Sequence, residues 1–218
     1  AIRQIVNDAI ISSEVIDVFD AAGIRKPDIS ILSDEFLAEI QGMERKNLAL
    51  ELLKRLLNDE IKTRGQMNTV QGRKFSEMLA EAVKRYQNGL IDSARMMEEL
   101  IKLAKDIRAA DERGEKLNLG KDEIAFYDAL ADNPKAEELL GDQVLLQIAR
   151  ELTISVRKNA SIDWQQKYGV QAKLRVLVKR VLRKYKYPPD DPATNDYTVS
   201  VNKVLDQATQ LADYWTKV

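Results

Sequence analysis

The residues with the clearest chemical character are seven lysines and arginines between Gln171 and Tyr187, a stretch that contains no acidic residue. Cations of this kind bind carboxylates or phosphates. If the stretch is helical, apolar residues recur every three or four positions and fall on the opposite side from the charges. A half-buried helix with charges of one sign predicts a docking surface for a negatively charged partner. This basic face comprises Lys173, Arg175, Lys179, Arg180, Arg183, Lys184 and Lys186.

Three interpretations of the basic face stay open. It is a solvated helix face, as most charge runs are; it contacts acidic protein, either a partner or the chain's own residues 92–142; or it contacts nucleic-acid phosphates. Residues 92–142 carry fourteen acidic and eight basic side chains, so they are a candidate internal counterpart. The net charge of −1 and the pI near 5.8 argue against a free-standing nucleic-acid-binding domain.

The rest of the sequence offers little for catalysis. There is no His and no Cys, which removes the commonest general base, the commonest transition-metal ligand and thiolate chemistry. No phosphate-binding glycine loop and no nucleophile elbow is present. Asp28, Glu60 and Lys62 formally resemble the motif of metal-dependent nucleases. Glu60 and Lys62, however, stand two positions apart on a predicted helix, so their side chains diverge by about 200° and do not converge on one metal ion. The neighbouring acids Glu98–Glu99 and Glu137–Glu138 diverge for the same reason. We therefore predict no catalytic, cofactor-binding or metal-binding residue.

The elements that must position the basic face are helices. Only nine Gly and five Pro occur in 218 residues, and charged residues make up 32%. Such a composition favours long helices over a turn-rich β fold. We predict an all-α fold, an irregular bundle of about eight to nine helices, with Ser33 and Asp142 as N-caps. Apolar periodicity predicts helices over 2–22, 34–41, 44–64, 73–88, 91–112, 122–131, 143–158, 171–187 and 196–215.

The connections suggest how the chain is organised. The polar stretch Gln66–Gly72 is predicted as a loose loop, and the charged, glycine-containing stretch 109–120 as the best hinge candidate. Residues 1–218 then form one helical region, with possible lobes 1–113 and 121–218 joined near 114–120. Met96, Met97 and Trp164 are expected in the core. An amphipathic pattern that has already begun at Ile2 suggests a piece of a longer protein; loss of an initiator Met is the alternative explanation for Ala1 as the first residue.

Several runs resemble, in wording and order, the C-terminal helical region of the motor (restriction, R) subunit of type I restriction–modification enzymes. The resemblance covers nearly the whole chain, although the tail after Pro192 matches poorly. Gly120 stands where the family offers a Ser-type N-cap, and Tyr168–Gly169 replaces a more charged pair. The matching runs are ILSDEFLAEIQGM (31–43), KNLALELLKRLLNDEIKTR (46–64), FSEMLAEAVKRYQN (75–88), MEELIKLAKDIRAADERGEKLNL (97–119), DEIAFYDAL (122–130), IARELTISVRKNASIDW (148–164) and AKLRVLVKRVLRKYKYPPD (172–190).

This resemblance implies a non-catalytic assembly module that docks the motor subunit to a methyltransferase–specificity core. The alternative is an element that contacts the DNA backbone and guides duplex near the motor. The parent protein would be an ATP-hydrolysing, site-specific deoxyribonuclease that uses ATP and Mg²⁺, in the cytoplasm of a bacterium or archaeon. Its partners would be the methyltransferase and specificity subunits, its own motor domains and double-stranded DNA, with no membrane. No catalytic position of the family has a counterpart in these residues.

Overall fold

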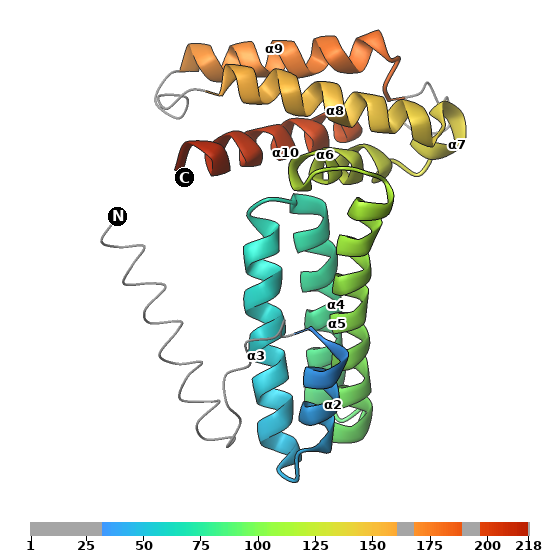
Figure 1. Ribbon diagram of the computed structural model, residues 1–218, viewed down its shortest axis with the longest axis vertical. Coiled ribbons are helices and arrows are strands. Elements are labelled where there is room, and N and C mark those ends of the chain that lie inside the picture. The colour runs from blue at the N-terminus through green and yellow to red at the C-terminus, as the bar shows by residue number, and fades with distance from the viewer. Residues whose placement is uncertain (1–31, 161–167, 189–196, 218) are drawn as a thin grey trace. The chain divides into compact units, whose positions relative to one another are not determined.

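The computed structural model describes residues 32–160, 168–188 and 197–217, and all regular structure in these ranges is helical (Figure 1). The nine helices found there, with no strand, confirm the predicted all-α fold. The predicted helix over 2–22 and the core position of Trp164 lie outside the described residues. The helices are α2 (Asp34–Gly42), α3 (Lys46–Gly65), α4 (Thr69–Gln87), α5 (Ser93–Lys116), α6 (Lys121–Ala131), α7 (Ala136–Leu140), α8 (Asp142–Asn159), α9 (Tyr168–Lys184) and α10 (Tyr197–Lys217).

The described residues form two compact units. The first comprises those up to Glu60 together with Glu77–Ala109, and the second comprises Ile61–Ser76 and those from Ala110 onward. Helices α3, α4 and α5 each contribute residues to both units. The predicted lobes with a hinge near 114–120 stay a prediction. No helix in the described ranges is both long enough and apolar enough to cross a lipid bilayer.

In the first unit, aliphatic side chains of α2, α3, α4 and α5 form the core. Met96 and Met97 are both buried there, as predicted. The predicted N-cap of α2 is also confirmed, since Ser33 Oγ accepts a hydrogen bond from the Phe36 N–H at 3.2 Å. An ion pair between Arg85 and Glu99, 2.9 Å long, joins α4 to α5.

In the second unit, α6 packs against both α8 and α10, and α8 packs against α9. Phe126 and Leu130 of α6 are completely buried at the centre of this core, together with Leu152 of α8 and Leu211 of α10. The short helix α7 was not predicted, because five residues are too few to show a helical period. The apolar row of α9 packs against α8, and α8 in turn packs against the central helix α6.

Three predicted helices have wrong boundaries. The helix predicted over 171–187 is α9, Tyr168–Lys184; it ends early because Lys186 adopts a positive φ of 55° and the Tyr187 N–H bonds back to the Leu182 carbonyl at 2.9 Å. Helix α4 begins at Thr69, inside the stretch predicted as a loose loop, because long-range contacts hold its first turn: the Thr69 N–H donates to Gln207 Oε1 at 2.9 Å. Helix α5 runs past residue 112 to Lys116 and ends where Asn118 adopts a positive φ of 51°. The Leu119 N–H then bonds back to the Gly114 carbonyl at 3.0 Å, which closes the helix end.

Two helix starts also differ from expectation. Asp142 is the first residue of α8 rather than its N-cap, which is Gly141, and its carboxylate accepts a hydrogen bond from the Tyr127 hydroxyl. Burial and this carboxylate raise the pKa of Tyr127 above its ordinary value. Helix α6 starts at Lys121, and its N-cap Gly120 has no capping side chain, but Glu123 Oε2 accepts from the Gly120 N–H at 2.8 Å. The Glu123 side chain therefore makes one of the two hydrogen bonds of a capping box, and the bond that a Ser hydroxyl at position 120 would make is missing.

Candidate functional site

Helix α9 carries six of the seven cations of the basic face, and its packing explains why the charges stay in solvent. Leu174, Val178 and Leu182, spaced four residues apart, are buried in the core of the second unit. All seven cations of the basic face are exposed. Lys186 follows the helix in a left-handed conformation, with φ of 55°, where the chain turns toward the buried Tyr187. The sequence periodicity thus separated buried from exposed positions correctly along this helix.

The cations fall into two rows on α9. The outer row consists of Arg175, Lys179 and Arg183, spaced four residues apart on one side of the helix. The groove row consists of Lys173, Arg180 and Lys184, which line a groove between α8 and α9. The single basic face of the sequence is therefore two surfaces with different neighbours.

The groove is an open depression of about 850 Å³. Helices α8 and α9 lie side by side (Figure 1) and form its walls. Val176 on α9 is 68% exposed and lies in the groove, and Ile154, 54% exposed, lies on the same stretch of α8. The groove therefore combines an apolar floor with positive charge. Its lining residues are Glu151, Ser155, Ala172, Lys173, Val176, Leu177, Arg180, Val181 and Lys184.

A polar contact joins the two walls of this groove. Lys184 Nζ lies 2.6 Å from Glu151 Oε2, and the Tyr185 hydroxyl donates to the same oxygen at 2.8 Å. These two hydrogen bonds lower the pKa of Glu151, and the bond to Glu151 raises the pKa of Lys184. The one carboxylate of the lining is thus neutralised within the groove, whereas Lys173 and Arg180 have no ion-pair partner among the described residues.

The acidic stretch 92–142 does not pair with the basic face in the described part of the chain. Its carboxylates have other partners instead. Asp132 accepts from Arg73 at 2.8 Å and from Lys203 at 2.7 Å, and Asp122 pairs with Arg157. The ion pair that does involve the basic face, Lys184 with Glu151, uses an acid outside that stretch. An internal acidic counterpart for α9 is therefore not found among these residues.

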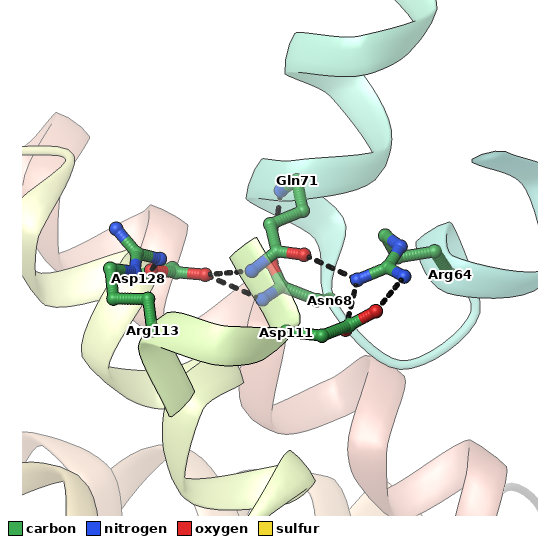
Figure 2. A network of polar contacts seen from close by, with 6 residues as sticks. All are labelled: Arg64, Asn68, Gln71, Asp111, Arg113 and Asp128. Carbon is green, nitrogen blue, oxygen red and sulfur yellow. Dashed lines mark hydrogen bonds and ion pairs between the residues drawn. The ribbon is translucent and has the colours of Figure 1, made fainter. Parts of the chain in front are cut away.

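A second polar feature lies inside the second unit, where α3, α4, α5 and α6 contribute to one network (Figure 2). Asp128, 6% exposed, accepts at Oδ2 from Asn68 Nδ2 and Gln71 Nε2, both at 2.7 Å. Its Oδ1 accepts from the Arg113 guanidinium. Arg64 bonds to Gln71 at 3.2 Å and makes two bonds to the Asp111 carboxylate. Every oxygen of Asp128 is occupied, so this network stabilises the fold and leaves no carboxylate free to react.

Neither feature has the composition of a catalytic centre. Within the described ranges, no group of three or more Asp or Glu side chains is placed to hold a metal ion. Glu60 and Lys62 of the formal nuclease motif both lie on α3, as predicted, while Asp28 lies outside the described residues. Among the described residues, the basic groove with its exposed valine is the feature best suited to bind a partner.

Sequence reasoning found the cations but missed the groove. Its second wall, Glu151 and Ser155, lies on α8 and becomes a neighbour only when the two helices pack. The one available signal was Val176, an apolar residue among cations, which a purely solvated face does not need.

The chain was compared with known protein families and with curated proteins. Residues 1–214 match the family described as type I restriction enzyme HindI endonuclease subunit-like, C-terminal. The type I restriction enzyme HindI endonuclease subunit of Haemophilus influenzae is 39% identical over 212 residues, which cover 97% of this chain and 20% of that protein. A putative type I restriction enzyme MjaIXP endonuclease subunit of Methanocaldococcus jannaschii is 35% identical over 214 residues, with the same coverage.

The chain thus spans about a fifth of the length of these curated relatives. No solved structure matches it at a significant level. The match runs along almost the entire sequence, including α8 and α9, which form the groove. This chain therefore belongs to the family of C-terminal regions of HindI-like endonuclease subunits of type I restriction enzymes.

Proposed function

We propose that this chain is a non-catalytic helical assembly module of the ATP-dependent, DNA-translocating subunit of a type I restriction–modification enzyme. It docks that motor subunit to the methyltransferase–specificity core through the basic face of α9. The observation that carries this proposal is the groove, in which exposed cations border an exposed apolar floor. A solvated face needs charge alone, whereas a docking surface combines apolar area with a polar rim.

The relatives' names support a multi-subunit setting, since both are subunits of type I restriction enzymes. In this proposal the nuclease and translocase activities, with their ATP and Mg²⁺, belong to the rest of the subunit. The complex acts on DNA in the cytoplasm, and this chain supplies attachment rather than a reaction. The absence of His, Cys and a phosphate-binding loop from the sequence is consistent with such a role.

The test is a binding titration of the chain with the purified methyltransferase–specificity core. Reversing four exposed cations, with Lys173, Arg175, Lys179 and Arg180 each changed to Glu, should weaken binding by about tenfold or more. The control reverses four exposed lysines scattered over α3, α4, α5 and α6, namely Lys62, Lys84, Lys102 and Lys121. Equal effects of the two sets, or unchanged affinity of the α9 variant with intact helicity, would contradict the proposal.

The outer row favours a second candidate function, contact with the DNA backbone. Arg175, Lys179 and Arg183 are exposed, evenly spaced and without ion-pair partners in the described ranges. Phosphate contact releases counterions, so it must strengthen as salt is diluted. A titration against generic duplex at two salt concentrations separates the candidates: steeply salt-dependent binding supports the backbone contact, and no binding at low salt eliminates it.

A further inference from the structure

We infer that the groove between α8 and α9 accommodates an acidic amphipathic helix of the partner, packed lengthwise between the two helices. This inference rests on the proposed docking function and specifies what the groove binds. It commits to a protein helix, in the manner of known helix-in-groove interactions. A DNA strand and a second copy of this chain are outcomes that the experiment below can return instead.

The shape of the groove favours a helix. Its lining residues on α9 run from Ala172 to Lys184, which is about 18 Å at 1.5 Å per residue. They recur at intervals of three and four, so one face of α9 lines the groove for three turns. Ser155 and Ala172 are small, which leaves room for a third backbone to approach. Two adjacent helices with such rows form the kind of groove into which side-chain ridges of a third helix pack.

The chemistry of the groove favours an acidic occupant. Lys173 and Arg180 stand seven residues apart, about two helical turns, and Val176 and Leu177 lie between them. The matching helix carries carboxylates about two turns apart with apolar residues between them, a spacing that repeats the pattern of α9. The carboxylate of Glu151 does not oppose this, because Lys184 and Tyr185 already bond to it.

The apolar floor argues against DNA at this place. Phosphate contact requires cations but gains nothing from an exposed valine and a partly buried leucine between them. The outer row provides cations without a comparable floor, since neither Arg175 nor Lys179 is among the described groove-lining residues. The two rows therefore allow the two kinds of partner to be distinguished on the same helix.

The decisive experiment compares two matched double variants of the 218-residue chain in binding to the methyltransferase–specificity core. K173E/R180E reverses one Lys and one Arg in the groove row, and K179E/R183E makes the same change in the outer row. We expect the groove variant to weaken binding by about tenfold and the outer variant by no more than about twofold. Val176→Asp should weaken binding as strongly as the groove variant, because it places a charge on the apolar floor.

A photo-crosslinking amino acid at Val176 identifies the occupant, with the same amino acid at the exposed Val199 of α10 as control. We expect the Val176 position to capture an acidic helical segment of the core, and the Val199 position not to. Capture of DNA, of a second copy of the chain, or of a segment without acidic residues would overturn the inference. So would equal effects of the two double variants, although the docking function would then survive. If the chain does not bind the core at all, the docking function fails together with the inference.

Discussion

Asp128 is a buried carboxylate in the interior of the second unit. Its carboxylate is 5% exposed and accepts hydrogen bonds from Asn68, Gln71 and Arg113 (Figure 2). A buried carboxylate without partners is costly, but this one has a donor for each oxygen and a guanidinium charge beside it. Removing it would leave two buried amide donors, on Asn68 and Gln71, without an acceptor.

We expect Asp128→Asn to lower the free energy of unfolding by about 2 kcal/mol. The NH₂ group of the new amide would face N–H donors of the neighbouring side chains and could not accept their hydrogen bonds. The matched control is Asp206→Asn on α10, where the aspartate is exposed and has no hydrogen-bond or ion-pair partner among the described residues. Urea denaturation of both variants measures the difference. Equal stabilities of the two variants would show that the network contributes nothing.

The contrast between Ser33 and Asp128 shows which residues a sequence can reveal. Ser33 caps α2 through a bond to Phe36, three residues away, so its role was predicted from the local pattern. Asp128 bonds to Asn68, sixty residues away, and no local pattern marks such a pair. Asp142 was predicted to be an N-cap for the same local reasons as Ser33. In the structure its carboxylate instead accepts a hydrogen bond from the hydroxyl of Tyr127, fifteen residues away.

At the scale of elements, the turn from α3 to α4 depends on two glycines that touch. A Cβ added at Gly72 would lie 2.5 Å from the Gly65 Cα, closer than any real contact, and that obstacle is backbone. We expect Gly72→Ala to destabilise the chain by about 1–3 kcal/mol, because the two helices must separate locally. Thermal unfolding followed by circular dichroism measures this change.

Gly169→Ala on α9 provides the opposite case. A Cβ there meets nothing within 4 Å, so the gain in helix propensity is unopposed and should stabilise the chain by about 0.5–1 kcal/mol. The same substitution in two helices thus has opposite predicted signs. A stabilising Gly72→Ala would disprove the close approach of α3 and α4.

Asp132, at the end of α6, links this helix to Arg73 of α4 and Lys203 of α10. Partial burial works to raise its pKa, but the hydrogen bonds and charges of Lys203 and Arg73 prevail and lower it. The stabilisation is therefore full above the unfolded-state value near 3.9 and disappears as the pH falls through the lower folded-state value.

We expect Asp132→Asn to cost about 1 kcal/mol at pH 7 and progressively less as the pH falls through the lowered folded-state pKa, because the wild-type carboxyl then becomes protonated as well. The measurement is the difference in unfolding free energy between the two proteins from pH 2 to pH 7. A difference that stays constant over this range would mean that the charge of Asp132 does not stabilise the fold.

Most helices could be predicted because their apolar rows are long and regular, as in α3 and α5. Two elements could not, for different physical reasons. The five residues of α7 are too few to show a period. The first turn of α4 lacks an apolar period and is held by a hydrogen bond to the distant Gln207 and by the close approach of Gly72 to Gly65. The groove escaped prediction because it requires the relative placement of α8 and α9, which neither helix determines alone.

At the scale of the whole molecule, the charges are distributed unequally although they nearly cancel. The described carboxylates of the second unit are largely paired, with Asp111, Asp122 and Asp132 each contacting an arginine. The cations of α9, apart from Lys184, have no ion-pair partner among the described residues. A chain of net charge −1 therefore presents a concentrated positive surface, and its interactions should be local and directional rather than a general attraction to polyanions.

This distribution leads to a prediction for the isolated chain. Incubated with ATP, Mg²⁺ and duplex DNA, it should neither hydrolyse ATP nor cleave DNA, because its sequence lacks a phosphate-binding loop and His, and the carboxylates of Asp128 and Asp132 are held in ion pairs. Release of inorganic phosphate and conversion of supercoiled plasmid are the two measurements. DNA cleavage by the purified chain that is lost in a Glu60→Gln variant would support the nuclease motif that was rejected above. Turnover unaffected by that substitution would place a reactive centre elsewhere in the chain and contradict a purely structural role.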